Sequence, residues 1–281
     1  MRRIATMVLA ALAIASCGKD ENKLASRYLK AASDCIGQSD YQQAKIYIDS
    51  VKIVYPKAFE ARREGIRLMQ QVELAEAERT LAYQDSALAV LNSQLNEIKT
   101  GFVFSKDEEY QDLGLYTVAS QALEKNAGQN YIRGMVDEKG RMTLVSNFHD
   151  AAYIHHRSLR LSAGDDYVDT PVSDDFYEFK DLGICYEKCN FTDGNDGGAA
   201  AFVALNRNAK IQVRLNGSRQ VLMTMRSSDR DAIAGLYSLS LLIKSIVEAT
   251  GLREEALRKI RFVNENIART SSGDQRFCPS L

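Results

Sequence analysis

The chain has 281 residues, 45% of them apolar, which is enough for one large or two modest domains with a real hydrophobic core. Its 36 basic and 37 acidic residues nearly balance, which argues against nucleic-acid binding, since that needs a basic face. Beyond residues 1–16, no apolar run is long enough to predict a membrane-spanning helix.

The first residues have the layout of a secretory signal. Arg2 and Arg3 supply positive charge, residues 4–15 are nearly all apolar, and small residues lead to Cys17. The apolar run is too short to span a bilayer. We therefore expect residues 1–16 to be removed as a signal peptide.

The segment Ile14-Ala15-Ser16-Cys17 resembles the bacterial lipobox. In proteins with that motif the cysteine is acylated and becomes the first residue. The resemblance therefore implies that Cys17 carries lipid and that membrane lipid is a partner. The alternative is an ordinary signal with an incidental cysteine. Removing the signal leaves 34 basic and 37 acidic residues, a net charge of −3.

The residues after Cys17 carry a second resemblance. Lys19, Asp20 and Glu21 resemble the export signal of Bacteroidetes surface lipoproteins, a lysine with two acids next to the lipidated cysteine. The resemblance implies a location on the outer face of the outer membrane, with residues 17–22 as lipidated cysteine and tether. The alternative is a plain tether on a lipoprotein that faces the periplasm.

Residues 23–100 are helical in composition. A helix over residues 23–36 precedes the stretch "SDYQQAKIYIDSVKIVYP", which resembles the second helix of a tetratricopeptide repeat, with Tyr41 and Ala44 at packing positions and Pro56 at its end. One such unit cannot bury its apolar face, and no second copy follows. We expect a helical hairpin that packs on its own chain. Its apolar face continues through Ile46, Ile48, Val51 and Val54.

A long helix is predicted over residues 58–99. Its leucines at a seven-residue spacing are Leu74, Leu81, Leu88 and Leu95. This spacing is typical of a coiled-coil seam, although Gln84 interrupts the companion position.

The predicted partner is a C-terminal helix over residues 227–270, followed by a tail over 271–281. Its apolar stripe comprises Ile233, Leu236, Leu239, Ile243, Ile246, Ala256, Ile260, Val263 and Ile267. Thr250-Gly251 predicts a kink or break within it. We expect the two long helices to pair antiparallel within one chain, and an oligomer through the leucine seam is the alternative.

Residues 101–226 are predicted to form a β-rich domain. Hairpins are expected where residues 131–136 meet 141–147 and in "SLRLSAGDDYVDT", two more strands in "FYEFKDLGICYEKCNF", and three further strands over residues 199–225. Seven to nine short strands suggest a sandwich or barrel-like sheet. The predicted fold is therefore α+β, with an antiparallel β domain inserted between the helices of a coiled-coil stalk.

Four cysteines remain beyond Cys17, namely Cys35, Cys185, Cys189 and Cys278. Cys185 and Cys189 are four residues apart in a predicted strand, roughly 13 Å in a straight strand and beyond disulfide reach. A disulfide between them would need a tight turn at residues 187–188. Free thiols are expected, with that disulfide and a metal site as alternatives.

The histidines His149, His155 and His156 lie close together in the sequence. Adjacent residues of a strand face opposite ways, so a zinc site would need ligands from elsewhere. We expect this stretch to form an exposed loop or edge strand. The loop "FTDGNDGGAAAF" resembles a calcium loop, but it lacks the closing glutamate, so a glycine-rich turn is expected. No metal or cofactor is predicted.

The sequence predicts a non-enzymatic binding or structural module. It contains no G-x-S-x-G, G-x-x-x-x-G-K-[ST] or G-x-G-x-x-G motif. The architecture resembles Bacteroidetes lipoproteins with a helical stalk and a β domain, a resemblance that implies no catalytic residues. The partner would be an extracellular ligand or another envelope protein. Tryptophan is absent, so sugar rings would have to stack on tyrosines such as Tyr131, Tyr153, Tyr167 and Tyr177.

Two alternatives remain from the sequence. The first is a periplasm-facing scaffold or assembly lipoprotein, whose helices hold another envelope protein. The second is a hydrolase with an unfamiliar site around residues 149–157. A pocket with perturbed carboxylates beside His155 would favour the hydrolase.

Overall fold

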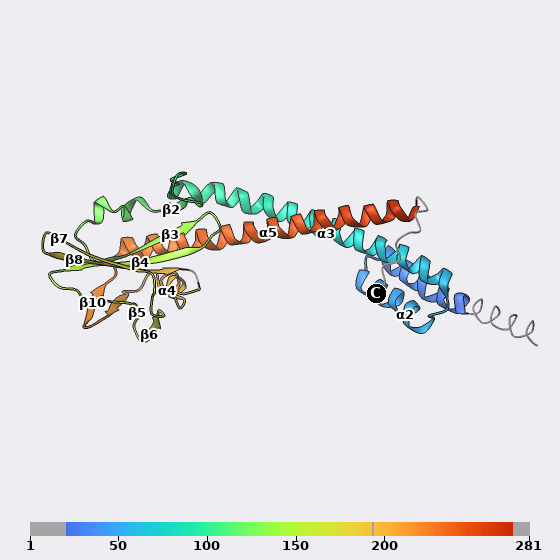
Figure 1. The fold of residues 1–281 in the computed structure, drawn as a ribbon, viewed down its shortest axis with the longest axis horizontal. Coiled ribbons are helices and arrows are strands. Elements are labelled where there is room, and N and C mark those ends of the chain that lie inside the picture. Colours follow the sequence, from blue (N-terminus) through green and yellow to red (C-terminus); the bar gives the residue numbers. More distant parts are fainter. Residues whose placement is uncertain (1–20, 193, 272–281) are drawn as a thin grey trace, which may run out of the picture. The chain divides into compact units, whose positions relative to one another are not determined.

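The computed structural model describes residues 21–192 and 194–271 (Figure 1). The chain divides into two compact units. Of the described residues, the helical unit comprises 21–86 and 250–271, and the β unit comprises 87–192 and 194–249. The predicted α+β class, with a β domain inserted between long helices, is confirmed.

In the helical unit a hairpin packs on a long helix. The hairpin is a first helix over residues 21–37 and α2 (Tyr41–Val54), and the long helix is α3 (Phe59–Ile98). Asp40 begins α2 by accepting the N–H of Gln43 at 3.1 Å. One apolar cluster joins all three helices through Ala25, Leu29, Ala32, Ala44, Ile48, Val51, Ala58, Ala61, Leu68 and Val72. The hairpin therefore packs on its own chain, as predicted.

Two details of the hairpin differ from the prediction. Ile46 and Val54, expected on the packed face, are exposed. Glu21 and Asn22, expected in the tether, lie in the first helix, and the side-chain oxygen of Asn22 accepts the N–H of Ala61 at 3.2 Å. This bond to α3 holds the start of the helix against the rest of the unit.

The helix α5 (Ser227–Ser271) runs antiparallel to α3 within the same chain. In the helical unit, Arg253 donates to Asp85 at 2.6 Å. In the β unit, Leu95 packs against the cluster that contains Leu236. Along the predicted seam all four leucines are half-buried, and Gln84, predicted to interrupt it, is buried.

The predicted break at Thr250-Gly251 is wrong, because α5 is one continuous 45-residue helix. A single glycine costs a helix only about 1 kcal/mol. Buried Ala249 and Ala256 hold the turns on either side of it. Packing therefore outweighs the local helix-breaking signal.

One described helix, α5, is long and apolar enough to span a membrane by length and composition, which differs from the sequence prediction. Its most apolar 18-residue window is 44% buried. The buried side chains include Ile233, Leu236 and Leu239, which belong to the core of the β unit. Packing against the sheets thus accounts for these apolar residues.

The β unit contains two antiparallel sheets. The six-stranded sheet has the order β1 (Val103–Ser105), β2 (Leu115–Thr117), β3 (Tyr131–Asp137), β4 (Met142–Asp150), β8 (Ile184–Thr192), β7 (Phe176–Asp181). The four-stranded sheet has the order β10 (Gln220–Thr224), β9 (Gln212–Asn216), β5 (Ser158–Ala163), β6 (Asp166–Asp169). Three short 3₁₀ turns are η1 (Lys99–Gly101), η2 (Ala119–Gln121) and η3 (Glu124–Asn126).

Both sheets share one core with α5 and with the short helix α4 (Ala199–Leu205). Residues 199–205 were predicted as a strand, and this prediction is wrong. Three successive alanines favour a helix, and Asp196 accepts the N–H groups of Gly198 and Ala200 at 3.1 and 3.0 Å. The later strands β9 and β10 are confirmed, as are the β3–β4 and β5–β6 hairpins and the strands β7 and β8.

Candidate functional site

Residues 151–157 carry the chain from β4 to β5, between the two sheets. His155 has a left-handed backbone (φ 53°), and the two adjacent histidines end in different environments. The His155 ring is largely exposed, whereas His156 is fully buried. The expectation of an exposed loop is therefore wrong for His156.

Glu187 of β8 is the reason that His156 is buried. Its carboxylate accepts the backbone N–H groups of Ile154, His155 and His156 at 2.5, 3.0 and 2.9 Å. The same group lies 2.7 Å from Nδ1 of the His156 ring. A buried carboxylate with this many donors is well satisfied. Glu187 therefore fastens the connection between the sheets to the middle of β8.

Ser146 of β4 completes the cluster, because its Oγ lies 2.6 Å from Nε2 of His156. Serine, histidine and glutamate thus follow one another in the order of a hydrolytic relay. A substrate must reach the nucleophile, but Ser146 is 0% exposed and the thiol of Cys189 donates to the His156 carbonyl at 2.8 Å beside it. In this arrangement the cluster acts as a clamp inside the core.

Two residues of the clamp, His156 and Glu187, have shifted pKa values. Burial lowers the pKa of His156 below its ordinary value, and the hydrogen bond to Glu187 opposes this only in part. Burial alone would raise the pKa of Glu187. The hydrogen bonds from the backbone and ring of His156 and from the N–H groups of Ile154 and His155 outweigh burial and lower it.

We expect the β unit to lose stability as the pH falls from 7 to 4. Unfolded His156 takes up a proton below a pH of about 6.5, and unfolded Glu187 below about 4.3, in each case before the folded group does. Urea unfolding, followed by hydrogen exchange over residues 184–192, measures the change at each pH. In the variant His156→Gln, the free energy of unfolding should no longer fall between pH 6.5 and 5, because the group that titrates there is absent. A wild-type stability that rises on acidification would contradict the assignment.

Cys185 and Cys189 are both buried and free, and Cys35 is also free. The strand β8 continues through residues 187–188, so the turn needed for a disulfide does not form. Burial raises the pKa of Cys189 to about 12, which keeps its thiol protonated at neutral pH. No group of three His, Cys, Asp or Glu is placed to hold a metal ion within the described residues.

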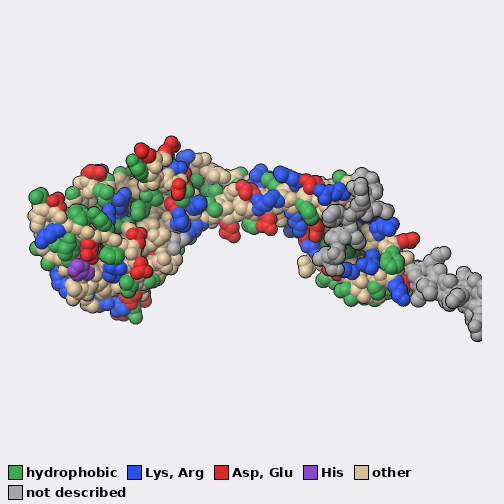
Figure 2. All heavy atoms as spheres, viewed as in Figure 1, with side chains coloured by type: hydrophobic (Ala, Val, Ile, Leu, Met, Phe, Trp, Pro, Cys, Tyr) green, Lys and Arg blue, Asp and Glu red, His purple; other side chains and the backbone are tan. Residues whose placement is uncertain are grey.

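The outer face of the six-stranded sheet carries a different arrangement. The strand register aligns two rows of side chains across β3, β4, β8 and β7. One row is Tyr131, Asn147, Lys188 and Tyr177. The other, called the aromatic row below, is His149, Tyr186 and Phe179. Figure 2 shows hydrophobic side chains mixed with charged ones over the end of the β unit that holds β7 and β8.

The rings of the aromatic row are stacked. His149 and Tyr186 lie 6.0 Å apart between ring centres at 20°, and Tyr186 and Phe179 lie 4.7 Å apart at 6°. Tyr177 extends the group, 5.5 Å from Phe179, and is 61% exposed. Mutual packing of these rings stabilises them as a preformed aromatic surface.

Residues 123–129 border this surface and form with it a groove of about 280 Å³. Its polar groups include the amides of Asn126, Gln129 and Asn147 and the ammonium of Lys188. Lys188 has no ion pair within the described residues, whereas Asn126 and Gln129 accept from Arg226. The groove therefore combines aromatic rings with one uncompensated positive charge.

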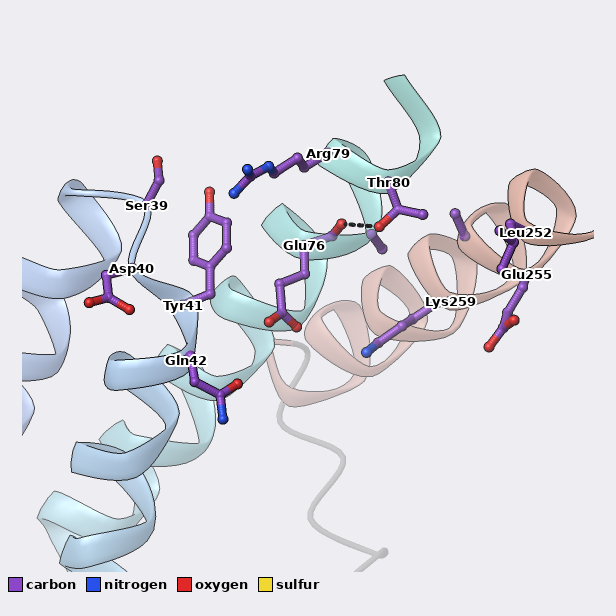
Figure 3. A pocket seen from close by; sticks show the side chains of 12 residues that line it. Ser39, Asp40, Tyr41, Gln42, Glu76, Arg79, Thr80, Leu252, Glu255 and Lys259 are labelled. Carbon is purple, nitrogen blue, oxygen red and sulfur yellow. Dashed lines mark hydrogen bonds between the residues drawn. The ribbon is translucent and has the colours of Figure 1, made fainter. Parts of the chain in front are cut away.

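The helical unit contains a larger hollow of about 560 Å³ between α2, α3 and α5. Figure 3 shows Tyr41 and Glu76 on one side and Lys259 of α5 extending toward them. Its charged residues are of both signs, and Glu76 is already paired with Lys45 at 2.6 Å. This balance favours no particular class of ligand.

The sequence-based site residues fall in different places. Cys17, Lys19 and Asp20 lie outside the described residues. His149 lines the groove and His156 belongs to the clamp, so the three histidines do not form one site. Glu187 was missed, although a glutamate between Cys185 and Cys189 at an inward strand position was a usable signal.

Comparison of the chain with protein-family models, curated proteins and solved structures finds no match.

Proposed function

We propose that this chain is a lipid-anchored outer-membrane protein on the cell surface, and that its β unit is a non-enzymatic binding module for a glycan. The aromatic groove carries this proposal. Stacked rings offer apolar surface for the C–H groups of a sugar ring, and amide and ammonium groups at the rim can bond its hydroxyl groups. Lipid on Cys17 would hold the module at the membrane.

The charge of the groove narrows the ligand class. Lys188 is the one exposed lysine, arginine or acidic side chain among the described groove residues, because the carboxylate of Glu187 is buried in the clamp. A positively charged ligand would be repelled by it. We therefore assign a neutral or acidic glycan, with a hydroxyl or carboxylate group on Lys188.

Binding to a glycan panel tests this assignment. We expect Tyr177→Ala to weaken the best ligand about tenfold, which corresponds to about 1.4 kcal/mol, because Tyr177 is the most exposed ring of the groove. Tyr167→Ala is the matched control, since Tyr167 is equally exposed but lies on β6 of the other sheet. Equal loss in both variants, or a panel without any bound neutral or acidic glycan, would contradict the proposal.

Protease treatment of whole cells tests the location. Wild type is compared with a variant in which Lys19, Asp20 and Glu21 are all changed to alanine. We expect the β unit of wild type to be digested and that of the variant to be protected. Protection of both proteins would place the module in the periplasm and overturn the surface location.

One observation favours the periplasmic scaffold as a second candidate. The helical unit exposes Ile53, Phe59 and Ile66, large apolar side chains of the kind found in protein–protein contacts. Protection from protease together with cross-links from these residues to another envelope protein would support the scaffold. The buried hydroxyl of Ser146 gives the hydrolase alternative no support.

A further inference from the structure

The strand β7 is an edge of the six-stranded sheet and bonds only to β8. Asn190 donates its N–H to the carbonyl of Asp175 at 2.9 Å, so odd-numbered residues here face β8. The N–H and C=O groups of Phe176, Glu178 and Lys180 therefore point away from the sheet. No hydrogen bond involves these backbone groups within the described residues.

This edge is the longest of the four in the β unit. It has six residues, against three in β1, four in β6 and five in β10. Phe176 and Phe179 are exposed on it. Edge strands of this kind are templates for pairing with another strand unless they are shortened, charged or covered.

The turn after β7 adds an unusual residue. Leu182 and Gly183 connect β7 to β8 with φ of 47° and 87°, a two-residue turn in which asparagine or glycine is normally preferred at the first position. Leu182 is nevertheless 95% exposed. A strained, apolar, solvent-exposed residue of this kind points to a function at the tip.

We propose that a second copy of this chain pairs with β7 edge to edge, antiparallel, about a twofold axis at Phe179. This register places Glu178 opposite Lys180 of the partner subunit, and the symmetry repeats that pair. Lys180 has no ion pair within the described residues, and Glu178 meets only the imidazole of His155. Both charges are thus available to the second copy.

Twofold axes at the two neighbouring residues, Glu178 and Lys180, do not fit the charges. A twofold axis at Glu178 would place two glutamates opposite each other, which is unfavourable in a cross-strand pair. Charged residues on an edge strand usually oppose pairing. Here they have opposite signs and are two residues apart, so in one register they attract.

The pairing would enlarge the aromatic surface and cover the exposed tip. Phe179 would meet Phe179 of the partner subunit, which joins the two aromatic rows across a twelve-stranded sheet. Leu182 would lie beside Phe176 of the partner subunit. The proposal rests on the strand edge and its charges, so it goes beyond glycan binding and does not depend on it.

Cross-linking on intact cells with the full chain tests the register. In a non-hydrogen-bonded pair at the twofold axis, Phe179→Cys would face its own copy about 4.5 Å away between Cα atoms, within disulfide reach. We expect mild oxidation to convert most of this variant into a species of twice the chain mass. Tyr177→Cys, on the same face and more exposed, is the matched control and should stay single. Wild type measures any link through the native cysteines.

Charge variants in the Phe179→Cys background supply the second test. Glu178→Lys alone and Lys180→Glu alone should each abolish the link, because like charges then meet twice. The two variants produced together, or both changes in one chain, should restore it. The proposal is wrong if Phe179→Cys does not link, if Tyr177→Cys links equally, or if combining the charge changes fails to restore the link. Folding is checked through the protease resistance of each variant.

Discussion

Replacing Glu187 with glutamine is expected to lower the free energy of unfolding of the β unit by about 3 kcal/mol. The carboxylate serves three backbone N–H groups and the His156 ring. An amide offers one acceptor oxygen and turns an NH₂ group toward the remaining donors, which leaves buried groups unsatisfied. Urea unfolding with hydrogen exchange over residues 184–192 reports on the β unit separately from the helical unit.

The matched control for this prediction is Glu178→Gln on the neighbouring strand. Glu178 meets the exposed ring of His155 at 3.0 Å, and an exposed pair of this kind contributes at most about 1 kcal/mol. If Glu187→Gln destabilises the β unit no more than Glu178→Gln does, Glu187 does not hold the connection between the sheets.

The second large effect is expected for Gly217→Ala, just after β9. A Cβ atom at Gly217 would lie 2.0 Å from the carbonyl oxygen of Ile154 and 3.0 Å from the nitrogen of His156. The segment it meets cannot move away easily, because Glu187 holds it from the other side. We expect a loss of about 3 kcal/mol, at the upper end for overpacked sites.

Gly101→Ala is the control for this variant, because a Cβ atom there would meet nothing within 4 Å. It should change the free energy of unfolding by less than about 0.5 kcal/mol. Both variants are compared by urea unfolding and by the exchange of the amide of Ser218, which donates to the Ile154 carbonyl at 2.6 Å. Equal stability of the two variants would show that Gly217 is not needed for the close approach.

The candidate site was only partly predictable. The sequence drew attention to the histidines, but the opposite environments of His155 and His156 arise in a loop with a left-handed backbone at His155, and strand alternation does not explain them. It could not show that His156 is buried, because its partner Glu187 comes 31 residues later, on a strand whose neighbours are set by the fold. The aromatic row likewise joins His149 to Tyr186 and Phe179 through strand pairing.

The sequence by itself determined the elements whose apolar residues recur at a short spacing, and the strands that short turns connect. Heptad leucines predicted the long helix α3. Alternating apolar residues with glycine turns predicted the hairpins β3–β4 and β5–β6 and the strands β7 and β8. What only the tertiary structure decided are the residues at which local preference and packing disagree. The helix α5 ran through Gly251. There, contacts between residues distant in sequence contribute more free energy than the local signal does, and those contacts exist only after the sheets and helices have come together.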